Sequence, residues 1–245
     1  MGTATGERIE MAGTEVQPQT APRVPLSRAR VLRAAVALAD RDGIEALTMR
    51  RLAQELGVEA MSLYHHVANK QALLDGLVDL IVLEVDDTLD QADVPSAADD
   101  WQAAMRARIL AARGVLLRHP WAPRILQTRT AISPAIIGYF DGLLGIFRAG
   151  GFSYDLAHHA LHTLGSRALG FTQELFEPDD PDGGDEQTLA MLEQMAERFP
   201  HLVGMLGEIS HDDPDSTLGW CDDQAEFEFG LDLILDGLEQ RRASA

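Results

Sequence analysis

Residues 47–70 read LTMRRLAQELGVEAMSLYHHVANK, and this segment constrains the fold more than any other part of the chain. Thr48 can cap a first short helix, whose apolar residues recur at helical spacing. Gly57 ends that helix, at a point where a sharp turn needs a residue that tolerates a positive φ. A second short helix, about residues 60–66, follows directly. Two helices joined by a tight turn with glycine are the unit that lays its second helix in a DNA major groove.

The second helix of this pair carries compact hydrogen-bonding side chains. These are Ser62, Tyr64, His65 and His66. Serine and histidine can bond phosphates or base edges, and tyrosine commonly holds a phosphate. Leu63 and Val67 are apolar and are expected in the core. The alternative is that the polar residues are only the surface of a small helical hairpin.

The segment from Leu26 to about Leu80 resembles the DNA-binding domain of the TetR family of bacterial repressors. The similarity lies in RVLRAAVALADRDGIEALTMRRLAQELGV and SLYHHVANKQALLDGLVD. Three shorter stretches, LLRHPWAPRILQTRT, FRAGGFS and FEFGLDLILDGLE, are similar to the tetracycline-repressor subgroup. The resemblance implies a ligand-responsive transcriptional regulator, expected to act as a repressor, which binds a palindromic operator as a homodimer.

The resemblance also implies which residues contact DNA. Thr48 and Arg50 lie at the start of the first motif helix, and Lys70 begins the helix after the motif. The expected contacts from the second motif helix are Ala60, Met61, Ser62, Tyr64, His65 and His66. Arg50 can bond a guanine through both arms of its guanidinium, whereas Lys70 suits a phosphate. Ala60, Met61 and His65 replace the residues of the tetracycline repressor, so a different operator sequence is expected.

The formal net charge of −19 is unevenly divided along the chain. Residues 23–75 hold eight Lys or Arg and six Asp or Glu, a net charge of +2. Residues 76–245 hold eleven Arg and thirty Asp or Glu, a net charge of −19. The acidic part should repel DNA, and the small positive surplus of the motif region predicts a moderate dependence of binding on salt.

The chain has 245 residues, of which 46% are apolar, enough for one small and one larger domain. The predicted division is a disordered leader at 1–25, a DNA-binding domain at 26–70 and an effector-binding and dimerisation domain at 71–245. Cys221 is the single cysteine, which fits a reducing compartment, so a cytoplasmic protein is expected. No apolar run reaches the length of a membrane span, so no membrane partner is expected.

Apolar residues recur at helical spacing along almost the whole chain and strand signals are nearly absent, so the fold class is predicted to be all-α. The predicted helices outside the motif cover 27–41, 70–89, 97–118, 133–148, 153–177, 186–207 and 223–241. Ser27 and Asn69 are the predicted caps of the first two. An irregular corner is predicted at 119–123, and acidic loops are predicted at 178–185 and 211–217.

The helices near 153–177 and 223–241 carry apolar residues on more than one face, which indicates burial on two sides. The TetR resemblance implies that they form a four-helix bundle across a two-fold axis. Paired reading heads about 34–36 Å apart would reach successive major grooves and require a palindromic site. A thick monomeric core is the alternative.

An effector site between the long helices is implied by the resemblance. The expected residues are Met105, Ile109, Thr128, Arg129, Phe140, Ser166 and Gln173. Asp86, Ile125 and Ser166 stand where the tetracycline repressor has histidines that help to hold its magnesium–drug chelate. Without these imidazoles a tetracycline chelate is not expected, and neither a metal nor another cofactor is predicted. The expected effector is a small, largely apolar molecule.

His158 and His162 stand four residues apart on one helical face, a spacing that can bind a metal, but no cysteine or nearby carboxylate clearly completes a ligand set. Packing at the dimer face or surface exposure is therefore preferred for them. Nothing in the sequence resembles a nucleophile elbow, a phosphate loop or a dinucleotide fingerprint, so no enzyme is predicted. The alternative function is a helical small-molecule-binding protein or enzyme without DNA binding.

Overall fold

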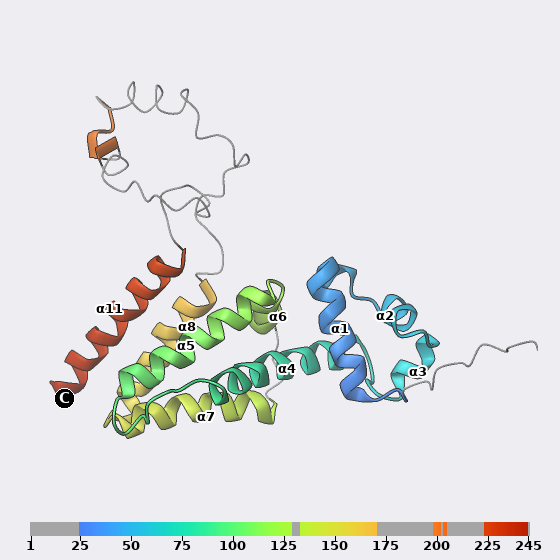
Figure 1. Ribbon diagram of the computed structural model, residues 1–245, viewed down its shortest axis with the longest axis horizontal. Helices are drawn as coiled ribbons and strands as arrows, with labels where there is room; N and C mark the ends of the chain where they lie inside the picture. Colours follow the sequence, from blue (N-terminus) through green and yellow to red (C-terminus); the bar gives the residue numbers. More distant parts are fainter. Residues whose placement is uncertain (1–24, 129–132, 171–197, 202, 205–222, 245) are drawn as a thin grey trace, which may run out of the picture.

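The computed structural model describes residues 25–128, 133–170, 198–201, 203–204 and 223–244. Its fold is all-α, as the sequence predicted. No strand occurs within these ranges. Figure 1 shows a small group of helices, α1 to α3, at one end of the molecule and a larger group of longer helices beyond it. Helix α4 begins in the small group, called the head below, and runs into the larger group, called the body. None of the helices in the described ranges is both long and apolar enough to cross a lipid bilayer.

The head is a helix-turn-helix unit preceded by one longer helix. Its elements are α1 (Arg28–Asp42), the 3-10 helix η1 (Ile44–Ala46), α2 (Met49–Leu56) and α3 (Ala60–Tyr64). The Ser27 hydroxyl accepts a hydrogen bond from the Arg30 amide at 3.2 Å, and the Thr48 hydroxyl accepts one from the Arg51 amide at 3.2 Å. Both helices therefore begin at the caps that the sequence predicted.

The turn between α2 and α3 depends on Gly57, whose φ of 66° and ψ of 35° lie in the left-handed region. The helix after the turn is shorter than predicted, because α3 ends at Tyr64 and not at His66. The amides of His66 and Val67 both donate to the Leu63 carbonyl, each at 2.9 Å. These bonds close a turn that leads the chain into α4.

The body contains α4 (Lys70–Asp90), whose first turn is capped by the Asn69 side chain, and the helices that follow it. Those in the described ranges are α5 (Trp101–Arg118), α6 (Ala122–Thr128), α7 (Pro134–Ala149), α8 (Tyr154–Gly170) and α11 (Asp223–Ala243). The predicted boundaries of α4, α7 and α11 are confirmed to within two residues. The predicted end of a helix at 177, the loops at 178–185 and 211–217, and most of the segment 186–207 lie outside the described residues.

The prediction that α5 begins near Ala97 is wrong. The helix begins at Trp101, because the Asp100 carboxylate accepts a hydrogen bond from the Ala103 amide at 2.9 Å and caps the helix at that point. A cap of this kind satisfies one of the backbone donors that a helix start leaves free.

The corner predicted at 119–123 is wrong in its length. Only its first residues form a turn, and α6 begins at Ala122. Pro123 lies in the first turn of this helix, where a residue without an amide proton loses no helical hydrogen bond. The buried side chain of Trp121 anchors the turn that precedes the helix.

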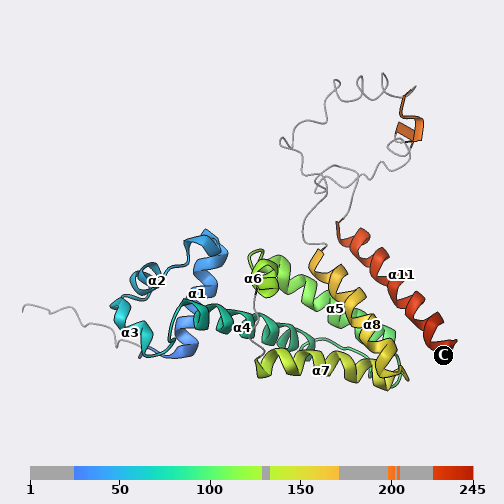
Figure 2. The same ribbon diagram turned by 180° about the vertical axis from the view of Figure 1, so that it is seen from behind.

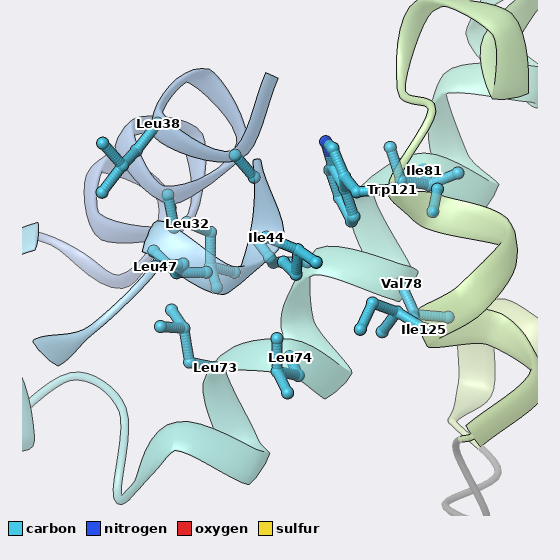
Figure 3. Close-up of a cluster of buried hydrophobic side chains, with 14 of the residues drawn as sticks. Leu32, Leu38, Ile44, Leu47, Leu73, Leu74, Val78, Ile81, Trp121 and Ile125 are labelled. Atoms are coloured by element: carbon cyan, nitrogen blue, oxygen red, sulfur yellow. The ribbon is translucent and has the colours of Figure 1, made fainter. Parts of the chain in front are cut away.

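A continuous apolar core joins the head to the body. Figure 3 shows Ile44 of the head, Leu74 and Val78 of α4, Trp121 from the turn before α6, and Ile125 of α6 in one cluster. All five side chains are at most 8% exposed. Full burial of a large apolar side chain stabilises a fold by about 1.5–3 kcal/mol, so this cluster holds the head firmly against the body.

A second core lies at the opposite end of the body. The Trp101 ring lies 5.9 Å from the Phe147 ring and 4.6 Å from the Phe152 ring, measured between centroids. Phe227 and Leu231 of α11 are fully buried in the same cluster. Figure 2 shows from behind that α11 runs along the edge of the body next to α8. The inner face of α11 thus completes this core, while its outer face borders solvent.

Replacing Gly57 with alanine should lower the free energy of unfolding by about 1 kcal/mol, because an L-residue is strained in the left-handed region. No atom lies within 4 Å of the added Cβ, so crowding does not contribute. Gly145→Ala is the matched control, since Gly145 also has nothing within 4 Å but lies inside α7. The free energy of unfolding of Gly145→Ala should rise by up to about 1 kcal/mol, because alanine has the higher helix propensity. Urea denaturation at one protein concentration measures both, and equal changes would contradict the expectation.

Candidate DNA-binding face and effector cavity

The second motif helix and the turn after it bury two apolar side chains and leave the others at least partly in solvent. Leu63 is fully buried and Val67 nearly so, whereas Met61 is 70% exposed and Tyr64 is 42% exposed. The other predicted DNA contacts that are exposed are Thr48, Arg50, His65 and Lys70, and those that are half-buried are Ala60, Ser62 and His66. All nine predicted contacts therefore reach solvent at least in part, and the two residues expected in the core do not.

Some cationic side chains of the head form ion pairs with carboxylates, and others do not. Arg51 donates to the Asp42 carboxylate at 2.7 Å, and Arg41 donates to both oxygens of Glu55 at 3.2 and 3.0 Å. Among the residues that the structure describes, Arg50 has no such partner. A guanidinium without an internal ion pair can bond a base edge or a phosphate without first giving up another contact.

A largely apolar cavity of about 330 Å³ lies between α4, α5, α7 and α8. Helix α4 contributes Val78, Ile81, Val82 and Val85 to its wall, and the end of α6 contributes Leu126 and Gln127. Gln127 and Tyr139 are the polar side chains of the lining. An apolar cavity with a few polar groups is typical of a binding site for a small organic molecule.

Two of the predicted effector residues, Ile109 and Phe140, line this cavity. Met105 lies one helical turn before Ile109 on α5, but it is fully buried in the second core and does not reach the cavity. The Thr128 hydroxyl donates to the Ile125 carbonyl at 3.0 Å, and Thr128 is not part of the lining. The structure therefore brings together only part of the predicted set.

The remaining predicted effector residues lie elsewhere. Ser166 is exposed, and its hydroxyl donates to the His162 carbonyl at 2.9 Å. Arg129 and Gln173 lie outside the described residues. The sequence reasoning missed the α4 wall and Tyr139. The signal that could have found the wall is the apolar character of α4 on several faces.

Tyr139 belongs to a polar group at the edge of the cavity. Burial raises the pKa of the Tyr139 hydroxyl, and the nearby Arg108 opposes this shift only in part. The Arg108 guanidinium donates to the Asp86 carboxylate at 2.7 Å and lies 4.9 Å from the centre of the Tyr139 ring. The phenol is therefore neutral and able to donate a hydrogen bond at neutral pH.

His158 and His162 are both exposed on α8, and their ring centroids lie 4.7 Å apart in a T-shaped arrangement. Aromatic contacts of this geometry stabilise a pair of rings modestly. In the described part of the chain, no group of three or more His, Cys, Asp or Glu side chains could hold a metal ion. The two histidines therefore form an exposed pair of rings on the α8 surface.

Known proteins resemble this chain along almost its full length. Residues 31–77 match the bacterial regulatory proteins of the tetR family, and residues 94–242 match the tetracyclin repressor-like C-terminal domain. The HTH-type transcriptional repressor DrrR1 of Streptomyces coeruleorubidus is 30% identical over 94% of this chain and 84% of the relative. The class C tetracycline repressor protein of Escherichia coli is 32% identical over 89% of this chain and 92% of the relative.

The chain belongs to the TetR family. It is a ligand-responsive, DNA-binding regulator of transcription. Among solved structures, the TetR family protein ActR of Streptomyces coelicolor in complex with actinorhodin superimposes with a TM-score of 0.66. ActR is 27% identical, with 89% of this chain and 99% of ActR covered. TetR family regulators are transcription factors and not enzymes.

In this TetR regulator, Arg50→Ala should weaken operator binding by about 1–3 kcal/mol and relax the preference for one base, because an unpaired guanidinium is lost. Arg51→Ala is the neighbouring control, since Arg51 is already bound to Asp42. It should change operator affinity by less than about 1 kcal/mol. Fluorescence anisotropy with a labelled duplex measures both constants. Equal losses in the two variants would show that Arg50 has no particular role.

Proposed function

We propose that two copies of this regulator bind one palindromic operator, and that a small, largely apolar molecule in the cavity controls this binding. The observation that carries the proposal is that α4 belongs to both sites. Its first residue, Lys70, is a predicted phosphate contact, and residues between Val78 and Val85 line the cavity. A ligand that binds two positions of α4 with different affinity would therefore change the position of the head.

The outer face of α11 supports a homodimer. Phe229 is 64% exposed and Leu233 is 59% exposed, and their spacing of four residues places them on one face. Phe227 and Leu231 point the other way, into the second core. A pair of large apolar side chains on a solvent face of this kind suits packing against the same face of a second copy. The two reading heads of such a dimer would then be related by a two-fold axis, as a palindromic site requires.

The polar groups at the cavity indicate the chemistry of the effector. The Tyr139 hydroxyl has no hydrogen-bond partner among the residues that the structure describes, so it can donate to a ligand. Arg108 is bound to Asp86 and is not available to neutralise an anion. We therefore expect a neutral, mostly apolar molecule with one or two hydrogen-bond acceptors. The bound actinorhodin of the related ActR supports an organic small molecule as the effector class.

A gel-shift experiment with the DNA upstream of the protein's own gene tests DNA regulation. We expect a sequence-specific complex that weakens moderately as salt is raised, because the positive surplus of residues 23–75 is only +2. An unrelated duplex of the same length is the control. If folded protein forms no specific complex at low salt, the proposed operator lies elsewhere or the function is wrong, and a selection from random DNA sequences decides between these outcomes.

Leu233→Glu should convert the dimer into a monomer, because the carboxylate would be buried without a partner in the pairing face. Operator binding should fall with it, since a single head contacts only half of a palindrome. Ile137→Glu is the matched control, as Ile137 is 57% exposed but lies on α7. Analytical ultracentrifugation measures the oligomeric state. A Leu233→Glu variant that remains dimeric would exclude this face of α11 from the interface.

Gly165→Leu should fill the cavity and block ligand binding. Gly165 lines the cavity, and a Cβ added there meets no atom within 4 Å. The neutral apolar dye Nile red serves as a probe, and its affinity should fall by at least about tenfold, or about 1.4 kcal/mol. Gly138→Leu is the control, since Gly138 is equally open but lies outside the lining. Unchanged dye binding in Gly165→Leu would show that the dye, and by inference the effector, binds elsewhere.

A further inference from the structure

A buried histidine connects the head to the body. His119 follows α5, and its side chain is only 9% exposed. The imidazole Nδ1 lies 2.7 Å from Oδ1 of Asp40, which belongs to α1 of the head. The other ring nitrogen, Nε2, lies 3.1 Å from Oε2 of Glu84, which belongs to α4. One ring therefore contacts carboxylates from two helices, one on each side of the boundary.

The two contacts are both favourable in only one protonation form of the His119 ring. An ionised carboxylate only accepts hydrogen bonds, and a neutral imidazole donates from one nitrogen only. In the neutral form, one ring nitrogen would direct its lone pair at a carboxylate oxygen. The imidazolium form donates to Asp40 and Glu84 together, and hydrogen bonds between ionised groups are about twice as strong as neutral ones.

Other groups around His119 donate hydrogen bonds to the same two carboxylates. The Trp121 indole donates to the same Asp40 oxygen at 2.6 Å. Arg118 donates to Oε1 of Glu84 at 3.1 Å from Nε and at 2.7 Å from a terminal nitrogen. Burial alone would raise the pKa of Glu84, but the hydrogen bonds from Arg118 and His119 outweigh it and lower that pKa. Glu84 therefore stays ionised at neutral pH and remains an acceptor for the ring.

We propose that His119 is a positioning residue which, in its protonated form, fixes the orientation of the head on the body. The inference rests on the proposed function, because an orientation matters only if two heads must fit one operator. Glu84 lies on α4 between Val82 and Val85, which line the cavity. A ligand that moved this part of α4 would pull Glu84 away from the ring. His119 thus links the state of the cavity to the angle of the head.

The sign of the pH dependence follows from this arrangement. Both hydrogen bonds are present while the ring carries two protons, and loss of one of these protons at higher pH removes one of the bonds. The head then gains freedom, and ordering it on DNA costs more free energy. Operator affinity should therefore fall as the pH rises from about 6 to about 8. The motif carries its own histidines, His65 and His66, so the effect of His119 is measured as the difference between the wild type and His119→Gln.

The protonation state is tested first on the full-length protein without DNA. Long-range proton–nitrogen spectra of protein labelled with nitrogen-15 at histidine show whether each ring nitrogen carries a proton. The His119 signals are assigned by their loss in His119→Gln. At about pH 7 we expect protons on both nitrogens of His119, because each nitrogen faces a carboxylate oxygen. A His119 ring that is neutral under these conditions overturns the proposal.

The positioning role is tested on the operator found by gel shift. Wild-type protein should lose about tenfold more affinity between about pH 6 and about pH 8 than His119→Gln does. Glu84→Gln keeps an acceptor oxygen but removes its charge, and it should flatten the profile in the same way even if His119→Gln fails to fold. Equal pH profiles in the wild type and Glu84→Gln would overturn the proposal. If the wild type binds no DNA at any pH, the proposed function fails, whereas the nitrogen-15 spectra still decide the state of His119.

Discussion

The apolar core that runs from the head into the body is the constraint on which the remaining structure depends. Helix-turn-helix units are small, and a unit of this size gains stability when its core continues into a larger one. Ile44 and Leu74 share a cluster with Trp121 and Ile125, so the head is packed as part of the molecule and is not tethered by α4 alone. Around this core, the polar contacts of Asp40 and Glu84 with His119 fix the angle that apolar packing leaves less strictly defined.

Much of the fold could be predicted because its signals are local. Ser27, Thr48 and Asn69 each cap the helix that directly follows, and a cap needs only its own side chain and the next turn. The start of α5 was placed too early, because several polar residues before Trp101 could serve as caps and only tertiary packing selects among them. Helix α6 is seven residues long, too short for an apolar repeat to separate it from a corner.

The two candidate sites also differ in how far local sequence determines them. Six of the nine candidate DNA contacts lie on α3 or in the turn directly after it, so the contrast between the buried Leu63 and its more exposed neighbours was readable in the sequence. The cavity is formed by several helices, and its lining depends on how they cross. Ile109 and Met105 lie on one face of α5 at a spacing of four residues and both belong to the second core, yet only Ile109 borders the cavity. Periodicity identifies the inner face of a helix, but it does not show where that face meets empty space.

The ion pairs of Arg41 and Arg51 have a consequence for how the protein searches a chromosome. They occupy two of the eight Lys and Arg side chains of residues 23–75, a segment whose net charge is only +2, and the acidic body adds no positive surplus to hold arbitrary stretches of duplex. Retention on the millions of unrelated sites of a genome is then weak, so most copies stay free to sample new positions. Occupancy of the correct site therefore depends on contacts with its bases.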